Sequence, residues 1–236
     1  MRLLVTRPEP DAERTAAALR GRGHSVVVAP LLRIEALPDA EIGSGPWAAI
    51  LVTSANAAQA IARHKHLTDL RTLPVFTVGE HTAQAMRAVG FSAVTSAGGH
   101  RGDLARLVTE RLKPRGTILH LAAADRSGDI AGDLSAQGFT VRTAVIYLAA
   151  AADSLPRPAA EALSQGIDGV LHYSRRSAET YVKLARAAGL LANALKPVHF
   201  CISAQVAEPL AQAGAGDVRV APQPTEVALL DLIAAP

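Results

Sequence analysis

Hydroxyl residues that directly follow apolar runs are the strongest candidates for ligand contact in this chain. Thr53 and Ser54 follow the apolar run 49–52, with Asn56 close behind, and Ser174 follows the run 169–173. In parallel sheets, ligands bind at the carboxyl ends of strands, where helix N-termini present free N–H groups. The pattern therefore predicts that these side chains face a ligand. The alternative, that Ser54 and Ser174 only cap the helices that follow them, stays open from the sequence.

A third strand end carries Gly79 and Thr82, within the segment VGEHT at 78–82. Gly79 has no side chain, so a ligand can approach its backbone closely. The equivalent segment later in the chain begins at Ser203. We therefore expect Gly79 to bring backbone amides near a ligand.

Tyr147 is the residue best suited to proton transfer. It ends the apolar run 141–146, in a segment where the chain is expected to cross between two domains. A phenol in such a position can donate a proton or a hydrogen bond to a ligand. An amphipathic tyrosine in a domain hinge fits the same pattern equally well.

Residues that usually mark metal, nucleotide or covalent chemistry show no matching pattern. His120, His172 and His199 fall within expected strands with no clustered acidic residues, so core histidines are favoured over a metal site. Cys201 lies in the apolar segment PVHFCI and is expected to be an inert core thiol. The sequence contains no GxGxxG, P-loop or G-x-S-x-G motif. We therefore expect no metal site, no nucleotide site and no catalytic thiol.

The composition argues against several classes of protein. The net charge is only +3, the basic residues are scattered, and aromatic residues make up 3%, so nucleic-acid binding has no support. No apolar stretch approaches the roughly 18 residues of a membrane span, and the N-terminus does not resemble a secretory signal. The single cysteine suits a reducing compartment. We expect a cytoplasmic protein with no nucleic-acid or membrane partner.

Short strands alternate with alanine-rich helices along the chain, which indicates an α/β fold with parallel sheets. A helix is expected at 8–20, and the last helix is expected to begin at 224–225 and run nearly to the C-terminus. The glycines between 98 and 102 are expected in a loop, with Asp103 entering the next helix. The expected strands are 3–6, 26–29, 49–53, 75–78, 118–121, 141–147, 169–173 and 198–202.

The two halves of the chain resemble each other. Three segments recur in the same order: 19–26 at 134–141, 49–60 at 169–180, and 77–90 at 201–214. Chance similarity between alanine-rich helices is the alternative for any one of them. The preserved order favours a duplicated α/β unit, and two copies are too few for a solenoid.

Taken in order, these segments resemble the uroporphyrinogen-III synthase family, and the resemblance spans essentially the whole chain. It rests on VTRP at 5–8, TSANA at 53–57, VGEHTA at 78–83, VIY at 145–147, the turn at Ser174, the segment 201–214, and P-x-P-T-x-x-x-L-L at 222–230.

The resemblance implies two similar parallel-sheet α/β domains of the flavodoxin or Rossmann type, joined by a two-stranded linker, with a cleft between them. The sequence offers two places for the chain to cross, at 31–39 and 141–152. Residues 1–36 and 150–236 then form one discontinuous domain. Residues 37–149 form the inserted domain, including the return linker strand.

The resemblance also implies an activity. The family consists of cofactor-independent lyases that cyclise the linear tetrapyrrole hydroxymethylbilane to uroporphyrinogen III, with inversion of ring D and loss of water. The family's proposed acid, a tyrosine that lines the cleft, corresponds to Tyr147. We expect a monomer whose substrate contacts are Arg7, Thr53, Ser54, Asn56, Gly79, Thr82, Ser174, Arg175 and Ser203. The arginines suit the substrate's carboxylates, although Arg175 would equally suit a solvated surface.

Some positions depart from the family pattern. Ser203 and Val206 stand where the family usually has Gly and Thr, and Arg175 follows Ser174 where a proline is common. Three alanines at 122–124 replace a turn that usually contains glycine. These differences leave open a second possibility, a catalytically inactive ligand-binding or regulatory protein of the same fold.

Overall fold

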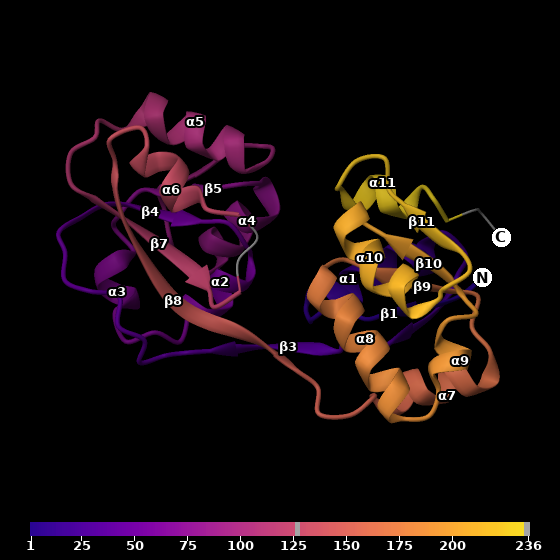
Figure 1. The fold of residues 1–236 in the computed structure, drawn as a ribbon. Coiled ribbons are helices and arrows are strands. Elements are labelled where there is room, and N and C mark those ends of the chain that lie inside the picture. Colours follow the sequence, from indigo (N-terminus) through magenta and orange to yellow (C-terminus); the bar gives the residue numbers. More distant parts are fainter. Residues whose placement is uncertain (126–127, 234–236) are drawn as a thin grey trace. The chain divides into compact units, whose positions relative to one another are not determined.

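The computed structural model describes residues 1–125 and 128–233, which divide into two compact units (Figure 1). Unit 1 comprises Met1–Arg33 and Ala150–Pro236, and unit 2 comprises Ile34–Ala149. In each unit, helices cover both faces of one sheet. The α/β fold class expected from the sequence is confirmed.

The sheet of unit 1 has five strands, and all of its pairings are parallel. Counted along unit 1, its strand order is 2-1-3-4-5, which is the flavodoxin-like order. Across the sheet the strands are β2 (Ser25–Val28), β1 (Arg2–Val5), β9 (Gly169–His172), β10 (Val198–Cys201) and β11 (Val218–Val220).

The apolar side chains of β1 alternate between the two faces of this sheet. Leu4 packs into the core under one set of helices, whereas Leu3 and Val5 pack into the core on the other face. Both cores exist because a central parallel strand is buried on both sides. The first core is covered by α7 (Arg157–Gln165), α8 (Arg175–Ala187), α9 (Leu191–Ala194) and α10 (Ala204–Ala213), and the second by α1 (Asp11–Gly21) and α11 (Glu226–Leu230).

The sheet of unit 2 has six strands, arranged as β3 (Leu32–Ala36), β8 (Thr140–Ala151), β7 (Thr117–Ala123), β4 (Trp47–Val52), β5 (Val75–Thr77) and β6 (Val94–Ser96). One face is covered by α2 (Asn56–Ile61), α3 (Leu67–Leu70) and α4 (Glu80–Ala88). The other face is covered by α5 (Arg101–Arg111) and α6 (Ile130–Ser135).

The chain passes between the units along β3 and β8, which are paired strands. Leu37 donates its N–H to the Ile146 carbonyl at 2.8 Å, and Ala152 donates to the Leu31 carbonyl at 2.9 Å. Residue numbers therefore rise on one strand as they fall on the other, so this pair is antiparallel. This antiparallel pair is the two-stranded linker expected from the resemblance, at the edge of an otherwise parallel sheet.

The two sheets repeat one arrangement. Strands β6-β5-β4-β7-β8 lie in the same order as β11-β10-β9-β1-β2, so β4 corresponds to β9 and β7 to β1. All three recurring sequence segments fall on elements that correspond in this way. The similarity of the two units, expected from the internal repeat, is confirmed.

Several boundaries differ from the sequence-based expectations. The short strands β6 and β11 were not expected, because three residues at a sheet edge carry little apolar pattern. Helix α1 begins at Asp11 rather than at residue 8, and α11 ends at Leu230. Gly102 lies inside α5 rather than in the loop, because the capping box between His100 and Asp103 starts that helix earlier.

Candidate functional site

The central pair of strands in unit 2, β4 and β7, forms the switch point of its sheet. From β4 the chain continues to β5 and β6 on one side, and from β7 it continues to β8 on the other. In open α/β sheets, ligands bind at the carboxyl ends of the strands where the order reverses in this way. Ser54 lies two residues after the end of β4, in the turn that leads into α2.

Tyr147 reaches this switch point from β8. Its phenol is hydrogen-bonded to Ser54, the residue is only 5% exposed, and its carbonyl accepts the N–H of Ala124 at 2.9 Å. Burial raises the pKa of the Tyr147 phenol, and the hydrogen bond to Ser54 partly opposes that rise. The phenol therefore keeps its proton at neutral pH. The structure thus brings together two residues that the sequence predicted at separate strand ends.

The other predicted residues of unit 2 also follow the carboxyl ends of strands in this sheet. Thr53 is exposed at the end of β4, and the Asn56 N–H donates to Ser54 Oγ at 3.3 Å. Gly79 is the N-cap of α4, and no described heavy atom lies within 4 Å of the position a Cβ would take there. Thr82, by contrast, is buried in the first turn of α4, 7% exposed.

In unit 1, Arg7 follows β1 and is held by acidic residues of its own chain. Its Nη2 lies 2.7 Å from Asp11 Oδ2, its Nη1 lies 3.0 Å from Glu226 Oε1, and its guanidinium stacks on the Tyr173 ring at 4.1 Å. Burial favours a higher pKa for the Glu226 carboxyl, but Thr15, Arg7 and Arg14 outweigh it, and the pKa is lowered. Both Nη atoms of Arg7 are therefore already paired with carboxylates of the same chain.

Ser174 is the N-cap of α8, and its side chain accepts the Ser177 N–H at 3.1 Å. The capping role that the sequence left open is thus present. Ser203 is the N-cap of α10, but within the described chain its side chain makes no capping hydrogen bond. These two positions correspond in sequence to Ser54 and Gly79 of unit 2.

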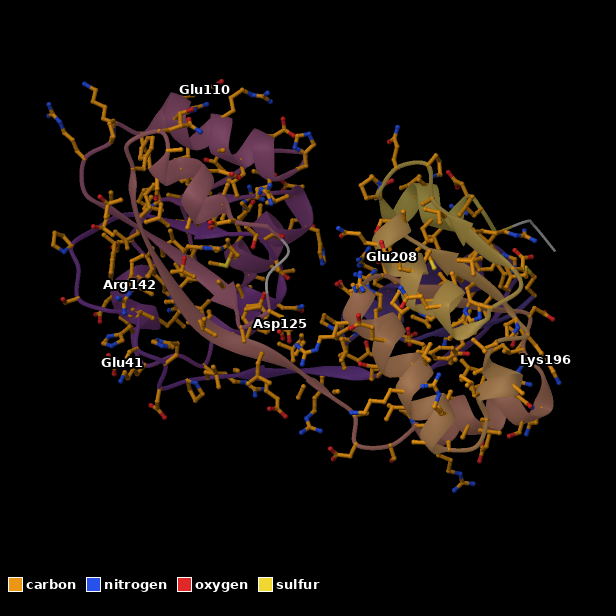
Figure 2. All side chains as sticks on the ribbon, in the orientation of Figure 1. Glu41, Glu110, Asp125, Arg142, Lys196 and Glu208 are labelled. Carbon is orange, nitrogen blue, oxygen red and sulfur yellow. The ribbon has the colours of Figure 1, made fainter. Side chains whose placement is uncertain are left out.

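Arg175 is exposed and paired with two acidic residues. Its Nε lies 2.9 Å from Glu179 Oε1, and its Nη1 lies 2.5 Å from Oε2 of Glu208, which projects from α10 (Figure 2). The surface interpretation offered for Arg175 agrees with this arrangement.

The strand histidines of unit 1 are core residues. His172 and His199 are fully buried and hydrogen-bonded to each other at 3.0 Å. Burial raises the pKa of the Cys201 thiol to about 12, which makes it a poor nucleophile at neutral pH. Across the described part of the chain, no group of three or more His, Cys, Asp or Glu side chains could hold a metal ion.

Comparison with known families decides the identity. The family model described as "Uroporphyrinogen-III synthase HemD" matches residues 13–231. The chain belongs to the uroporphyrinogen-III synthase family. Among curated proteins, no sequence matches this chain significantly.

Solved structures of uroporphyrinogen-III synthases share the fold. The enzyme from Helicobacter pylori 26695 is 18% identical, with a TM-score of 0.67 and 98% of each chain covered. A mutant of the Thermus thermophilus enzyme is 17% identical, with a TM-score of 0.51, and the match covers 98% of this chain and 96% of that one. At these identities the likeness establishes the two-domain fold.

The sequence analysis missed the residues that hold Arg7. Glu226 lies 219 residues after Arg7, and Tyr173 donates its hydroxyl to Glu226 Oε1 at 3.2 Å. The only available signal was the family motif at 222–230, which contains Glu226.

No helix within residues 1–125 and 128–233 has the length and hydropathy of a membrane span.

Proposed function

We propose that this chain is a uroporphyrinogen-III synthase, a lyase that converts hydroxymethylbilane to uroporphyrinogen III with inversion of ring D and loss of water. Family membership supports this assignment. The observation that carries it beyond membership is the Tyr147–Ser54 pair at the switch point of unit 2. A protonated phenol at such a position suits assisted departure of a hydroxyl group.

In the proposed reaction, Tyr147 donates its phenolic proton to the substrate's terminal hydroxyl as the C–O bond breaks. The adjacent pyrrole nitrogen supplies the electron pair that expels water and leaves an azafulvene. The azafulvene carbon first bonds to the substituted α-carbon of ring D, and the bond from that α-carbon to its methylene bridge then breaks to give a second azafulvene. The free α-carbon of ring D closes onto this second azafulvene, which inverts the ring. The proton lost from that α-carbon restores the phenol. The products are uroporphyrinogen III and water, so the step balances without an oxidant or reductant.

Several finer features belong to the same proposal. The substrate itself supplies the electron pair, so the reaction is expected to need no cofactor and no metal. The substrate contacts Arg7, Thr53, Ser54, Asn56, Gly79, Thr82, Ser174, Arg175 and Ser203 remain predictions. We also propose that the enzyme acts as a monomer in the cytoplasm.

The decisive experiment supplies the purified chain with freshly made hydroxymethylbilane, with and without a chelator, and separates the uroporphyrinogen isomers. The III isomer is expected in both conditions. Formation of only the spontaneous I isomer would reject the synthase assignment and favour the inactive binding protein. Loss of activity with the chelator would reject metal-independent chemistry.

Tyr147→Phe tests the acid. Turnover is expected to fall at least roughly tenfold, since general acid catalysis typically contributes about 10²–10⁴-fold. Tyr181→Phe is the matched control, because it removes a buried phenol that donates to the Ala194 carbonyl in the core of unit 1. Near-parental turnover of Tyr147→Phe would remove Tyr147 from this role.

A further inference from the structure

Tyr147 owes its orientation to a one-residue bulge in β8. Val145 pairs with Ala122, but the next pair joins Tyr147 to Ala123, so Ile146 is an extra residue without a partner in the register. Side chains on a regular strand alternate between faces. Ile146 and Tyr147 are consecutive, yet both pack into the core beneath α2. The bulge therefore keeps Tyr147 on the α2 face, where a regular strand would turn it to the opposite face.

Ala123 leaves room for the phenol to cross β7. It pairs with Tyr147 on one side, and it packs at the edge of the same core. On the other side, β7 pairs Leu121 with Val52 of β4, and Ala123 and Ser54 each lie two residues beyond this last pair. Tyr147 therefore reaches Ser54 across one strand, β7, on which the residue paired with Tyr147 is alanine. A larger side chain at position 123 would fill that space.

Ser54 is also fixed in place by the backbone. Its Oγ accepts the N–H of Asn56 at 3.3 Å, which holds the hydroxyl at the entrance of α2. A serine hydroxyl that accepts one hydrogen bond can still donate its own proton. A phenolate oxygen can only accept hydrogen bonds, so Ser54 must be the donor once Tyr147 has lost its proton.

We propose that Ser54 is a positioning residue for Tyr147: its hydroxyl, held by the Asn56 amide, donates to the phenol oxygen, leaves the phenol proton free for the substrate, and stabilises the phenolate that forms. This assignment rests on the proposed function. It extends it by naming the group that supports the acid. In this proposal the bulge at Ile146 and the small residue at Ala123 both allow the Tyr147 ring to reach Ser54.

The proposal predicts a change in Tyr147 that can be measured without substrate. The chain has three tyrosines, so labelling with tyrosine carrying ¹³C at Cζ gives three signals, and Tyr147→Phe assigns the relevant one. In Ser54→Ala the pKa of Tyr147 is expected to rise by about 1 unit, the size of a lost hydrogen bond to a charged group. The Cζ shift at pH 7 is expected to change as well. Ala123→Leu should produce the same change, and Ser54→Thr should restore the parental signal.

Ser96→Ala is the matched control. Ser96 Oγ accepts the Gly98 N–H at 3.2 Å, two residues on, as Ser54 does with Asn56, but at the end of β6. Ser96→Ala therefore removes a hydrogen bond of the same kind at a site that does not contact Tyr147. Identical Tyr147 signals in Ser54→Ala and the parent chain would overturn the proposal.

Turnover separates this inference from the proposed function. With hydroxymethylbilane, Ser54→Ala is expected to lower kcat about tenfold, because the lost hydrogen bond supports the acid in the transition state. A shifted Tyr147 signal in a chain that makes no uroporphyrinogen III would reject the synthase, and with it the catalytic purpose of the pair. If the parent chain is active but the Tyr147 signal and pKa are unchanged in Ser54→Ala, only the role of Ser54 is rejected.

Discussion

Nε2 of His172 lies 3.0 Å from Nδ1 of His199 in the core of unit 1, and both rings are fully buried. Such a bond requires one ring to donate and the other to accept, so at least one ring must be neutral. Burial lowers the pKa of His199 to about 4, against the weaker opposite effects of the Ala194 backbone and Asp217. Burial and the neighbouring His199 lower the pKa of His172.

This pair makes the stability of unit 1 sensitive to acid. In the unfolded chain the histidines take up protons near pH 6.5, whereas the folded chain resists protonation until about pH 4 at His199. The stabilisation is complete above pH 6.5 and is lost as the pH falls from there towards 4. Because of the lowered pKa of His199 alone, the unfolding free energy should fall by about 2 kcal/mol between pH 6.5 and 5.

Denaturant unfolding at both pH values measures this loss. His199→Leu should reduce the difference between the two pH values, whatever its effect on absolute stability. His66→Gln is the control, because the His66 side chain is 42% exposed. An unchanged pH difference in His199→Leu would contradict the prediction.

Ser174 and Ser203 occupy equivalent N-cap positions but differ in their bonds. Ser174→Ala should lower the unfolding free energy by about 1 kcal/mol, because its hydroxyl caps α8. Ser203→Ala should cost less than about 0.5 kcal/mol, since no capping bond from its side chain exists in the described chain.

Ser174→Asn separates capping from substrate contact. Asparagine caps helices about as well as serine, so stability should be retained. If the Ser174 hydroxyl contacts the substrate as predicted, kcat/KM should still fall roughly 5- to 30-fold. Full activity of a stable Ser174→Asn enzyme would reduce Ser174 to a cap.

Arg7 is predicted to act first on the stability of unit 1. In Arg7→Lys a single ammonium cannot reproduce the contacts of both Nη atoms with Asp11 and Glu226. We expect a loss of about 1–2 kcal/mol in unfolding free energy. Arg20→Lys, which alters an exposed ion pair with Glu13, should cost less than about 0.5 kcal/mol. A raised KM in a fully stable Arg7→Lys enzyme would instead support direct substrate binding by Arg7.

The sequence allowed the central strands of both sheets to be predicted, because buried parallel strands form continuous apolar runs. It also placed Ser54 and Ser174 just after strand ends, whereas Tyr147 lies inside β8, which continues to Ala151. The recurrence of 49–60 at 169–180 was informative for the same reason, since both segments build a strand and the helix after it.

The bond between Tyr147 and Ser54 was not predictable. A period of two along β8 turns Tyr147 away from Ile146, and only the shifted register, which depends on pairing with β7, brings it back. The partners of Arg7 were hidden for a related reason. Asp11 is close in sequence, but Glu226 is not, and no local pattern joins residues 219 positions apart.

The insertion of unit 2 into unit 1 has a consequence for the order of folding. Unit 2 is one continuous stretch, Ile34–Ala149, and all of its strands from β4 onward are made before β9 exists. Strand β1 can pair with β9 only after β9 has been synthesised. The Arg2 amide likewise bonds to Asp168, which lies 166 residues later in the chain. Closing so long a loop is slow, and domains tend to fold as they emerge during synthesis. The second unit in the chain is therefore expected to be the first to fold, while the N-terminal strand-helix-strand of unit 1 stays unprotected until the C-terminal segment arrives.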